Sequence, residues 1–260
     1  MTHVLDAHAR RVADQVLAEE EGRRRHLVVA LSGAHAYGFP SPDSDLDLKA
    51  IHIAPTRSLL GLSEPPVTTD RMEVIEGVEI DYTSNELGAA LRGLIKGNGN
   101  YLERVLGVHL LATTSLLDEL APLVRAGLSK RYYRHYLGFA RQQQQDLEKA
   151  TAPTAKTVLY VLRTALTGAH LLRAGALRVD LNENVEEYGY QDARELIERK
   201  RSGERTVLDG ATAIHWRERV KHAFAVLEEA HRASKLPEDA PNLADLDRWL
   251  VDVRMRETRL

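Results

Sequence analysis

The chain of 260 residues is 43% hydrophobic and 28% charged, which is the composition of a soluble globular protein with one large domain or two modest ones. It has no cysteine, which excludes disulfides, thiolate nucleophiles and cysteine-ligated zinc, and its net charge of -3 argues against a surface that binds polyanions all over. No apolar run reaches the roughly 18 residues of a membrane span, and the charged N-terminus is unlike a secretory signal, so we expect a cytoplasmic protein.

The first elements predicted are a helix, a strand and a turn. Apolar residues recur at helical spacing over residues 2–21. The segment HLVVALSG, residues 26–33, has the pattern of a buried strand that runs into a turn at Ser32 and Gly33. Backbone N–H groups exposed by such a turn could hold phosphate oxygens.

The next strand carries two aspartates. Asp45 and Asp47 alternate with leucines, which places both carboxylates on one face of the strand. The segment MEVIEGVEIDYTS, residues 72–84, predicts one or two further short strands, and Glu79 and Asp81 share a face there. Together these acids could supply three oxygen ligands for Mg²⁺, the ion that phosphoryl transfer commonly uses. The alternative is an Asp-Ser-Asp turn that only caps and solubilises a hairpin.

From about Asn85 onward the pattern is helical to the end of the chain. Helices are expected at 85–96, 100–107, 114–126, 129–150, 154–174, 190–203, 210–234 and 242–257. We therefore predict an α+β fold, in which a small mixed β-sheet with flanking helices is followed by an all-α C-terminal half. The corresponding domains are 1–110 and 111–260.

The helix predicted at 154–174 is apolar except for one stripe. The stripe has helical spacing and consists of Lys156, Tyr160, Arg163, Thr167 and His170. A helix that is apolar around most of its circumference should be buried, so the stripe is expected to face an internal cleft, where its cations could grip a triphosphate. An ordinary solvated face is the alternative.

Other polar segments have simpler interpretations. We interpret Asn98, Asn100 and Glu103 as a helix-capping turn with a structural glutamate. Three basic stretches, 23–25, 130–136 and 198–205, are interpreted as solvated helix surface in preference to nucleic-acid sites. The eleven histidines form no HxH or HxxxH pair, which gives a zinc site little support.

Three segments of the chain resemble a known family. GAHAYGFPSPDSDLDLKAIHI, residues 33–53, is similar to the Gly-Ser turn and Asp-x-Asp strand of DNA polymerase beta superfamily nucleotidyltransferases. Within that superfamily it resembles the RlaP-type predicted nucleotidyltransferases, named after an RNA repair pathway. KGNGNYLERVL, residues 96–106, and KTVLYVLRTALTGAHLLRAG, residues 156–175, look like further segments of that family, although Gly99 replaces a proline. The resemblance covers residues 26–175.

The resemblance implies a nucleotidyltransferase that uses an NTP such as ATP and Mg²⁺ or Mn²⁺. It implies Asp45, Asp47 and Asp81 as catalytic metal ligands, with Glu79 the rival of Asp81. The nucleotide-binding residues that we expect are Ser32, Gly33, His35, Lys156, Tyr160 and Arg163. Ala34 stands where the family has serine, and the loss of a hydrogen bond to a charged phosphate costs about 1.5–3 kcal/mol. His35 is the better placed substitute donor.

Three functions remain open at this stage. The first is transfer of a nucleoside monophosphate from an NTP to a hydroxyl at an RNA or DNA end. The second is the same transfer to a protein side chain or a small molecule, which a pI of about 6.4 fits more comfortably. The third, suggested by Ala34, is a weakly active or inactive module that binds a nucleotide.

Overall fold

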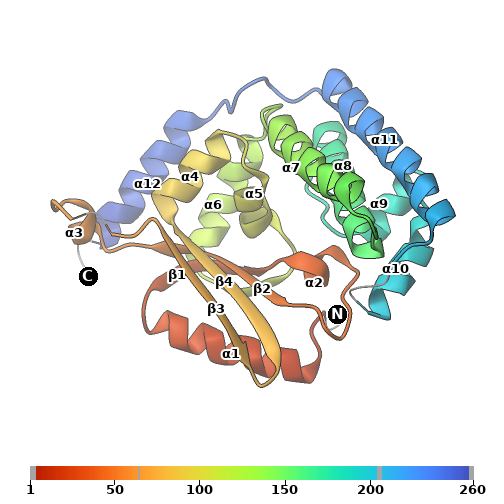
Figure 1. The fold of residues 1–260 in the computed structure, drawn as a ribbon. Coiled ribbons are helices and arrows are strands. Elements are labelled where there is room, and N and C mark those ends of the chain that lie inside the picture. The colour runs from red at the N-terminus through yellow and green to blue at the C-terminus, as the bar shows by residue number, and fades with distance from the viewer. Residues whose placement is uncertain (1–3, 64, 204–206, 258–260) are drawn as a thin grey trace. The chain divides into compact units, whose positions relative to one another are not determined.

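The computed structural model describes residues 4–63, 65–203 and 207–257 (Figure 1). The strands are β1 (Arg25–Leu31), β2 (Leu46–Ile53), β3 (Thr68–Ile75), β4 (Val78–Glu86) and β5 (Leu110–Thr113). The helices of the N-terminal half are α1 (Ala7–Glu21), α2 (Gly33–Tyr37), α3 (Thr56–Leu59), α4 (Leu87–Ile95), α5 (Gly99–Leu106) and α6 (Ser115–Ala126). Those of the C-terminal half are α7 (Tyr132–Lys149), α8 (Ala155–Ala174), α9 (Leu181–Glu187), α10 (Ala193–Arg201), α11 (Gly210–Ala233) and α12 (Leu243–Glu257).

The chain divides into two compact units. The sheet unit comprises Met1–Gly33, Asp45–Leu128 and Asp239–Leu260, and the helical unit comprises Ala34–Ser44 and Ser129–Glu238. Each unit is therefore discontinuous in the chain, whereas the predicted domains 1–110 and 111–260 are continuous. The predicted division into domains stays a prediction.

The sheet unit is built on five strands in the order β3-β4-β2-β1-β5. Only β2 and β4 run parallel, while the other neighbouring pairs are antiparallel. α1 covers one face, where it packs on Leu46, Leu48 and other even-numbered positions of β2 and β4. α4 and α5 lie on the opposite face (Figure 1). Because strand side chains alternate, the odd-numbered positions of β2 and β4 face α4 and α5.

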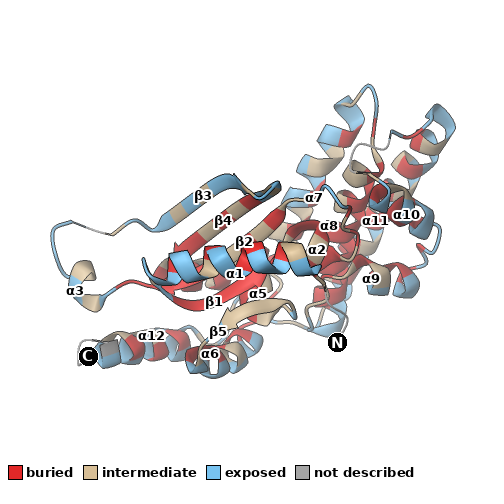
Figure 2. Ribbon diagram, turned by 90° about the horizontal axis from the view of Figure 1, so that it is seen from below, coloured by how far each residue is buried: buried red, intermediate tan, exposed pale blue. Residues whose placement is uncertain are grey.

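The helical unit is organised around α8. α7, α9, α10 and α11 all contact α8, and Figure 2 shows α8 red, the colour of buried residues, along most of its length. A Gly175 in the left-handed conformation (φ 64°) ends the helix, as expected for a C-terminal glycine. Arg163, Thr167 and His170 of the polar stripe are buried, which confirms that this part of the stripe does not face bulk water.

The α+β fold predicted from the sequence is confirmed, with a mixed sheet first and helices dominating the C-terminal half. The segment 72–84 contributes to two full strands, and each expected helix is present within a few residues. The prediction of helix alone beyond Asn85 is wrong at β5, a four-residue edge strand that pairs with β1. Residues 2 and 3 of the first predicted helix lie outside the described residues. In the part of the chain that the structure describes, no helix has the length and apolarity that a membrane span requires.

Candidate active site

Two of the predicted carboxylates lie side by side on the face of the sheet that α5 covers. Asp47 of β2 and Asp81 of β4 are register partners in the parallel pair. Glu79 shares the face of Asp81 but lies beyond the paired stretch, since the register begins at Leu46 and Ile80. This pairing supports Asp81 over Glu79 as the neighbour of the Asp-x-Asp strand.

A lysine that the sequence reasoning missed lies between these carboxylates. The Lys49 ammonium is 2.8 Å from Asp81 Oδ2 and 3.7 Å from Asp47 Oδ1. It also donates to the Asp81 carbonyl oxygen at 3.3 Å. Lys49 follows Asp47 by two positions on one strand, so it shares the face of the carboxylates and offsets their mutual repulsion. A cation therefore fits between the two side chains.

Gly33, the first residue of α2, has a conformation that brings the backbone against Asp47. Its φ is +62°, and a Cβ at this position would overlap Asp47 Oδ2. The N–H of Ser32 donates to the Asp47 carbonyl oxygen at 2.9 Å. Glycine is required here for two reasons, because other residues rarely adopt this φ and because a side chain would displace the carboxylate.

Asp45 precedes the first residue of β2 and is half-buried. Among the described residues, no group of three or more histidine, aspartate or glutamate side chains is arranged to hold a metal ion. The structure thus pairs Asp47 with Asp81, and the set of three carboxylate ligands stays a prediction.

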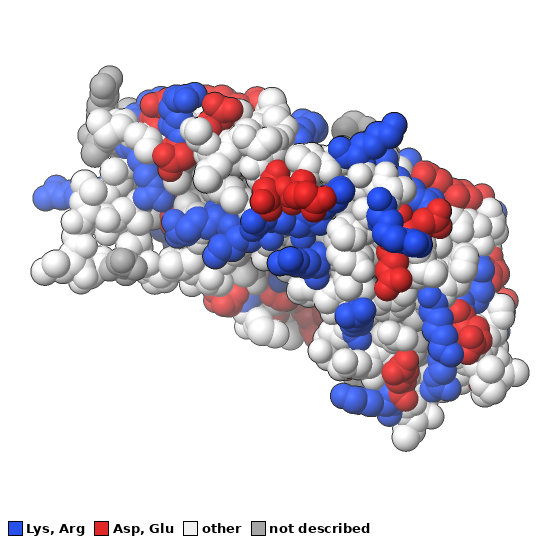
Figure 3. All heavy atoms as spheres, turned by 90° about the horizontal axis from the view of Figure 1, so that it is seen from above, with Lys and Arg blue, Asp and Glu red and all other residues white. Residues whose placement is uncertain are grey.

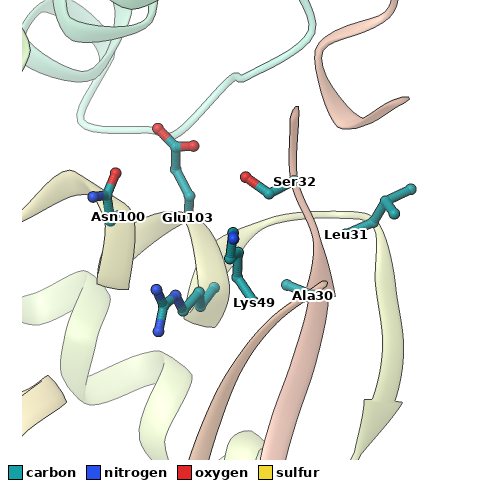
Figure 4. A pocket seen from close by; sticks show the side chains of 7 residues that line it. Ala30, Leu31, Ser32, Lys49, Asn100 and Glu103 are labelled. Atoms are coloured by element: carbon teal, nitrogen blue, oxygen red, sulfur yellow. The ribbon is translucent and has the colours of Figure 1, made fainter. Parts of the chain in front are cut away.

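A small cavity adjoins the carboxylate pair (Figure 4). Its volume is about 120 Å³, and its lining consists of Ala30, Leu31, Ser32, Lys49, Asn100, Glu103 and Arg104. In Figure 4 the polar ends of Ser32, Lys49 and Glu103 point toward the same space. Lys49 is common to the cavity and the carboxylate pair, so the two features form one site.

The start of α5 contains a helix cap and two residues that line the cavity. Asn98 is the N-cap, and its side chain accepts from the Asn100 N–H at 2.9 Å, which confirms the capping interpretation. Asn100 and Glu103, however, line the cavity, and the interpretation of Glu103 as merely structural missed this. Their spacing of three residues was the available signal, because it places both on one helix face.

Arg104 forms the buried wall of the cavity. It is 8% exposed, and it donates to the Ala50 carbonyl oxygen at 2.9 Å and to the Asn85 side chain. Its Nε is buried and has no hydrogen-bond partner among the described residues. Burial lowers the pKa of the Arg104 guanidinium, an effect that nearby acids oppose.

The other predicted nucleotide-binding residues belong to the helical unit. The Arg163 guanidinium carbon is 3.5 Å from the centroid of the Tyr37 ring, and the Tyr160 ring lies edge-on to Tyr37 at 6.1 Å. Lys156 lies over the Tyr160 ring at 5.9 Å. His35 is half-buried in α2. These contacts assign the stripe a packing role within its own unit, and its nucleotide role stays a prediction.

The basic stretch 198–205 is not uniformly solvated, which corrects the sequence interpretation. Lys200 is completely buried, and its Nζ donates to Ser41 Oγ at 2.6 Å and to Ser44 Oγ at 2.8 Å. The Lys200 ammonium therefore contacts the loop after α2, just before the chain reaches Asp45. Residues 204 and 205 lie outside the described residues. Figure 3 shows basic and acidic side chains in close neighbourhood on the face that it presents.

Comparisons with known proteins found a matching family model and two uncharacterized relatives. The sequence model described as "RNA repair pathway DNA polymerase beta family" (RlaP) matches residues 9–252. The uncharacterized protein MJ0002 of Methanocaldococcus jannaschii is 31% identical over 158 residues, which are 60% of this chain and 64% of that protein. The chain thus spans a little under two thirds of that relative. The uncharacterized protein YcgL of Bacillus subtilis is 27% identical over 212 residues, covering 76% of this chain and 79% of that protein.

Several solved structures are also similar, and one of them illustrates the degree of likeness. It is a nucleotidyltransferase-like protein from Exiguobacterium sibiricum, which is 14% identical with a TM-score of 0.36. The match covers 95% of this chain and 80% of that chain. A TM-score of this size does not establish a common fold.

Proposed function

From the premise that this chain belongs to the RNA repair pathway DNA polymerase beta family, we propose that it is a metal-dependent nucleotidyltransferase. In this proposal it moves a nucleoside monophosphate from an NTP to a hydroxyl at an RNA or DNA end. The observation that carries the proposal is the register pairing of Asp47 with Asp81 next to a polar cavity.

The residues present fit a divalent cation. Carboxylate oxygens are the ligands that Mg²⁺ and Mn²⁺ prefer, and the Lys49 ammonium already lies against both side chains, 2.8 Å from Asp81 and 3.7 Å from Asp47. Asp47 and Asp81 would hold the ion, with Asp45 as the expected third ligand. When bound, such an ion would stabilise the negative charge that develops on phosphate oxygens during transfer.

The chain's own residues position the reactants. The acceptor hydroxyl oxygen bonds to the α-phosphorus of the NTP, the bond from that phosphorus to the β-phosphate oxygen breaks, and pyrophosphate leaves. The hydroxyl proton passes to a carboxylate of the pair. Gly33 leaves room for the Asp47 side chain at this place. Ser32 and Lys49 border the adjoining cavity.

NTPs labelled at either of two phosphates test the proposal, because they show where each phosphate goes. The protein is incubated with Mg²⁺ or Mn²⁺ and with each NTP labelled at the α- or the γ-phosphate, in separate reactions with RNA, DNA or protein alone. We expect α-label on an RNA or DNA end and γ-label in pyrophosphate. Label on the protein itself would assign the second acceptor class.

Matched variants separate the site from general effects. Asp47→Asn should remove transfer, since one metal ligand is lost while the side-chain shape is kept. Asp14→Asn, an equal change at a half-exposed residue of α1 that pairs with Arg10, should leave transfer unchanged. Normal transfer by the Asp47 variant would refute the metal site. NTP binding without any transfer would make the chain a nucleotide-binding module.

A further inference from the structure

A second cavity of the sheet unit lies where β1 begins and β2 ends, and its volume is about 730 Å³. His52 of its lining follows Asp47 by five residues of β2, which corresponds to about 17 Å of strand. The even-numbered His52 also faces the α1 side of the sheet, whereas Asp47 faces the opposite side. The cavity is therefore separate from the site proposed for transfer, and its volume suits a ligand of nucleotide size.

Two buried histidines line this cavity side by side. His26 and His52 are register partners in the antiparallel pair of β1 and β2, so their side chains are neighbours on one face of the sheet. Each residue is only 6% exposed. His26 Nε2 is 2.7 Å from the Tyr82 hydroxyl oxygen. His52 Nδ1 is 2.8 Å from Ser84 Oγ. These two contacts fix the orientation of both rings.

The direction of these hydrogen bonds decides what the rings offer to the cavity. Burial, and after it the Arg24 cation, lowers the pKa of both histidines to about 4, so each ring is neutral at pH 7 and carries one N–H. The Tyr82 hydroxyl accepts from Arg24 at 3.1 Å, so its own proton is donated to His26 Nε2. The buried Ser84 hydroxyl likewise donates to His52 Nδ1, its partner among the described residues. The ring N–H groups are therefore at His26 Nδ1 and His52 Nε2.

These two N–H groups have no acceptor in the part of the chain that the structure describes. Neither nitrogen is sealed from solvent, since the sealed polar atoms without a partner in that part of the chain belong to other residues. Buried donors are nearly always paired, so two neighbouring donors on one cavity indicate a ligand rich in acceptors. Arg24 pairs with Glu20 and still lowers the pKa of both rings, which makes the potential at the rings positive and favours an anion. Phosphate oxygens meet both conditions.

We propose that this cavity is a phosphate site, in which His26 and His52 donate to the phosphate oxygens of a nucleotide. The stretch 23–25, interpreted from the sequence as solvated surface, also lines the cavity and brings guanidinium N–H groups to it. Ile53 and Pro55 of the lining offer an apolar surface for the sugar or the base. The nucleotide has two sources, a free nucleotide or one unit of a single-stranded RNA. The inference goes beyond the proposed function and does not depend on it, because the site binds a phosphate without reacting with it.

Binding in the absence of divalent ions tests this site apart from transfer. The intact protein is titrated calorimetrically in EDTA. One arm compares AMP with adenosine, and the other compares a single-stranded RNA decamer with the same sequence joined by uncharged methylphosphonate links. We expect wild type to bind the phosphate-containing ligand about tenfold or more tightly, as hydrogen bonds to a charged group provide. A preference in the AMP arm identifies a free nucleotide, and a preference confined to the RNA arm identifies RNA. No preference in either arm overturns the proposal.

Variants locate the preference in this cavity. His26→Gln and His52→Asn each keep an amide near the nitrogen that contacts the hydroxyl and lose the second ring nitrogen. Each should lower the affinity for the phosphate-containing ligand about tenfold, without changing that for the uncharged one. His135→Gln on α7 is the matched control, since burial also lowers the pKa of that ring to about 4, and it should bind as wild type does.

A change at the edge of the cavity tests the site without altering either ring. Thr69 of β3 lines the cavity and is half-exposed. Thr69→Glu places a negative charge there and should remove the preference for phosphate, whereas Thr69→Gln has the same shape and should keep it. Urea titration shows which variants are folded, and the Thr69 pair decides if the histidine variants are not. A preference that survives in every folded variant places the phosphate elsewhere and overturns the proposal.

Discussion

Replacing Gly33 by alanine tests whether the turn after β1 must leave room for the Asp47 carboxylate. The structure predicts two separate costs for Gly33→Ala. The residue has φ +62°, where a side chain costs about 1–2 kcal/mol, and its new Cβ would overlap Asp47 Oδ2. The carboxylate must then move by a substantial part of its own size, and a misplacement of about 1 Å can lower a reaction rate about a hundredfold.

Gly77 provides the control because it shares the first cost and not the second. It lies in the β3–β4 hairpin turn with φ +83°, and a Cβ there would meet no atom within 4 Å. Both alanine variants should therefore lose about 1–2 kcal/mol in the free energy of unfolding, measured by urea titration. Only Gly33→Ala should also lose nucleotidyl transfer, by about a hundredfold in kcat/KM.

One result of comparing the two glycine variants would refute the catalytic role of Gly33. If Gly33→Ala transfers label at the rate of Gly77→Ala, the close approach of Gly33 to Asp47 has no catalytic importance. The assignment of Asp47 to the reacting centre would then rest on its register pairing with Asp81 alone.

Three further predictions concern other parts of the molecule. Arg163→Lys should lower the free energy of unfolding of the nucleotide-free protein by about 1 kcal/mol in urea titrations, because the planar stack on an aromatic ring is lost; unchanged stability would contradict the packing role. Lys200→Met should speed amide hydrogen exchange in the loop 41–44 about tenfold or more, while Lys200→Arg should have a smaller effect; equal exchange in wild type and both variants would show that the lysine does not hold the loop. Burial lowers the pKa of His26 and of His52 to about 4, so the unfolded chain binds more protons between pH 6.5 and 4 and the free energy of unfolding should fall as pH drops through this window. Urea titrations at pH 7, 5.5 and 4.5 measure it, and a His52→Gln variant that keeps the full pH dependence would contradict this cause.

Periodicity predicted most of the fold because most elements are long and have a regular pattern of apolar residues. α8 and α11 have many apolar residues at helical spacing, and the buried β1 reads as a continuous apolar run. β5 escaped detection because four residues, none fully buried, carry too little pattern. The division into discontinuous units depends on contacts between distant segments, such as Ser41 with Lys200, which no local pattern contains.

Within the candidate site, local spacing indicated which acids share a face but not what surrounds them. That Asp81 lies opposite Asp47 follows from the register of two parallel strands, and a shift by one residue would turn every side chain to the other face. The places of Lys49 and Glu103 at the site were missed because a charged residue on a strand or helix looks solvated until its neighbours are known. Lys200 shows the same error, because it lies in a basic run that was interpreted as solvated and yet is fully buried.

The most direct test of the central claim is Mn²⁺ binding to the carboxylates of β2 and β4. Electron paramagnetic resonance can count bound Mn²⁺ while an NTP analogue with a methylene bridge between the α- and β-phosphates prevents transfer. We predict that wild type and Asp14→Asn bind Mn²⁺ together with the analogue, and that Asp47→Asn and Asp81→Asn each weaken this binding by about tenfold or more, the loss of one charged ligand interaction. Equal Mn²⁺ affinity in wild type and both site variants would contradict the claim that Asp47 and Asp81 form the metal-nucleotide site.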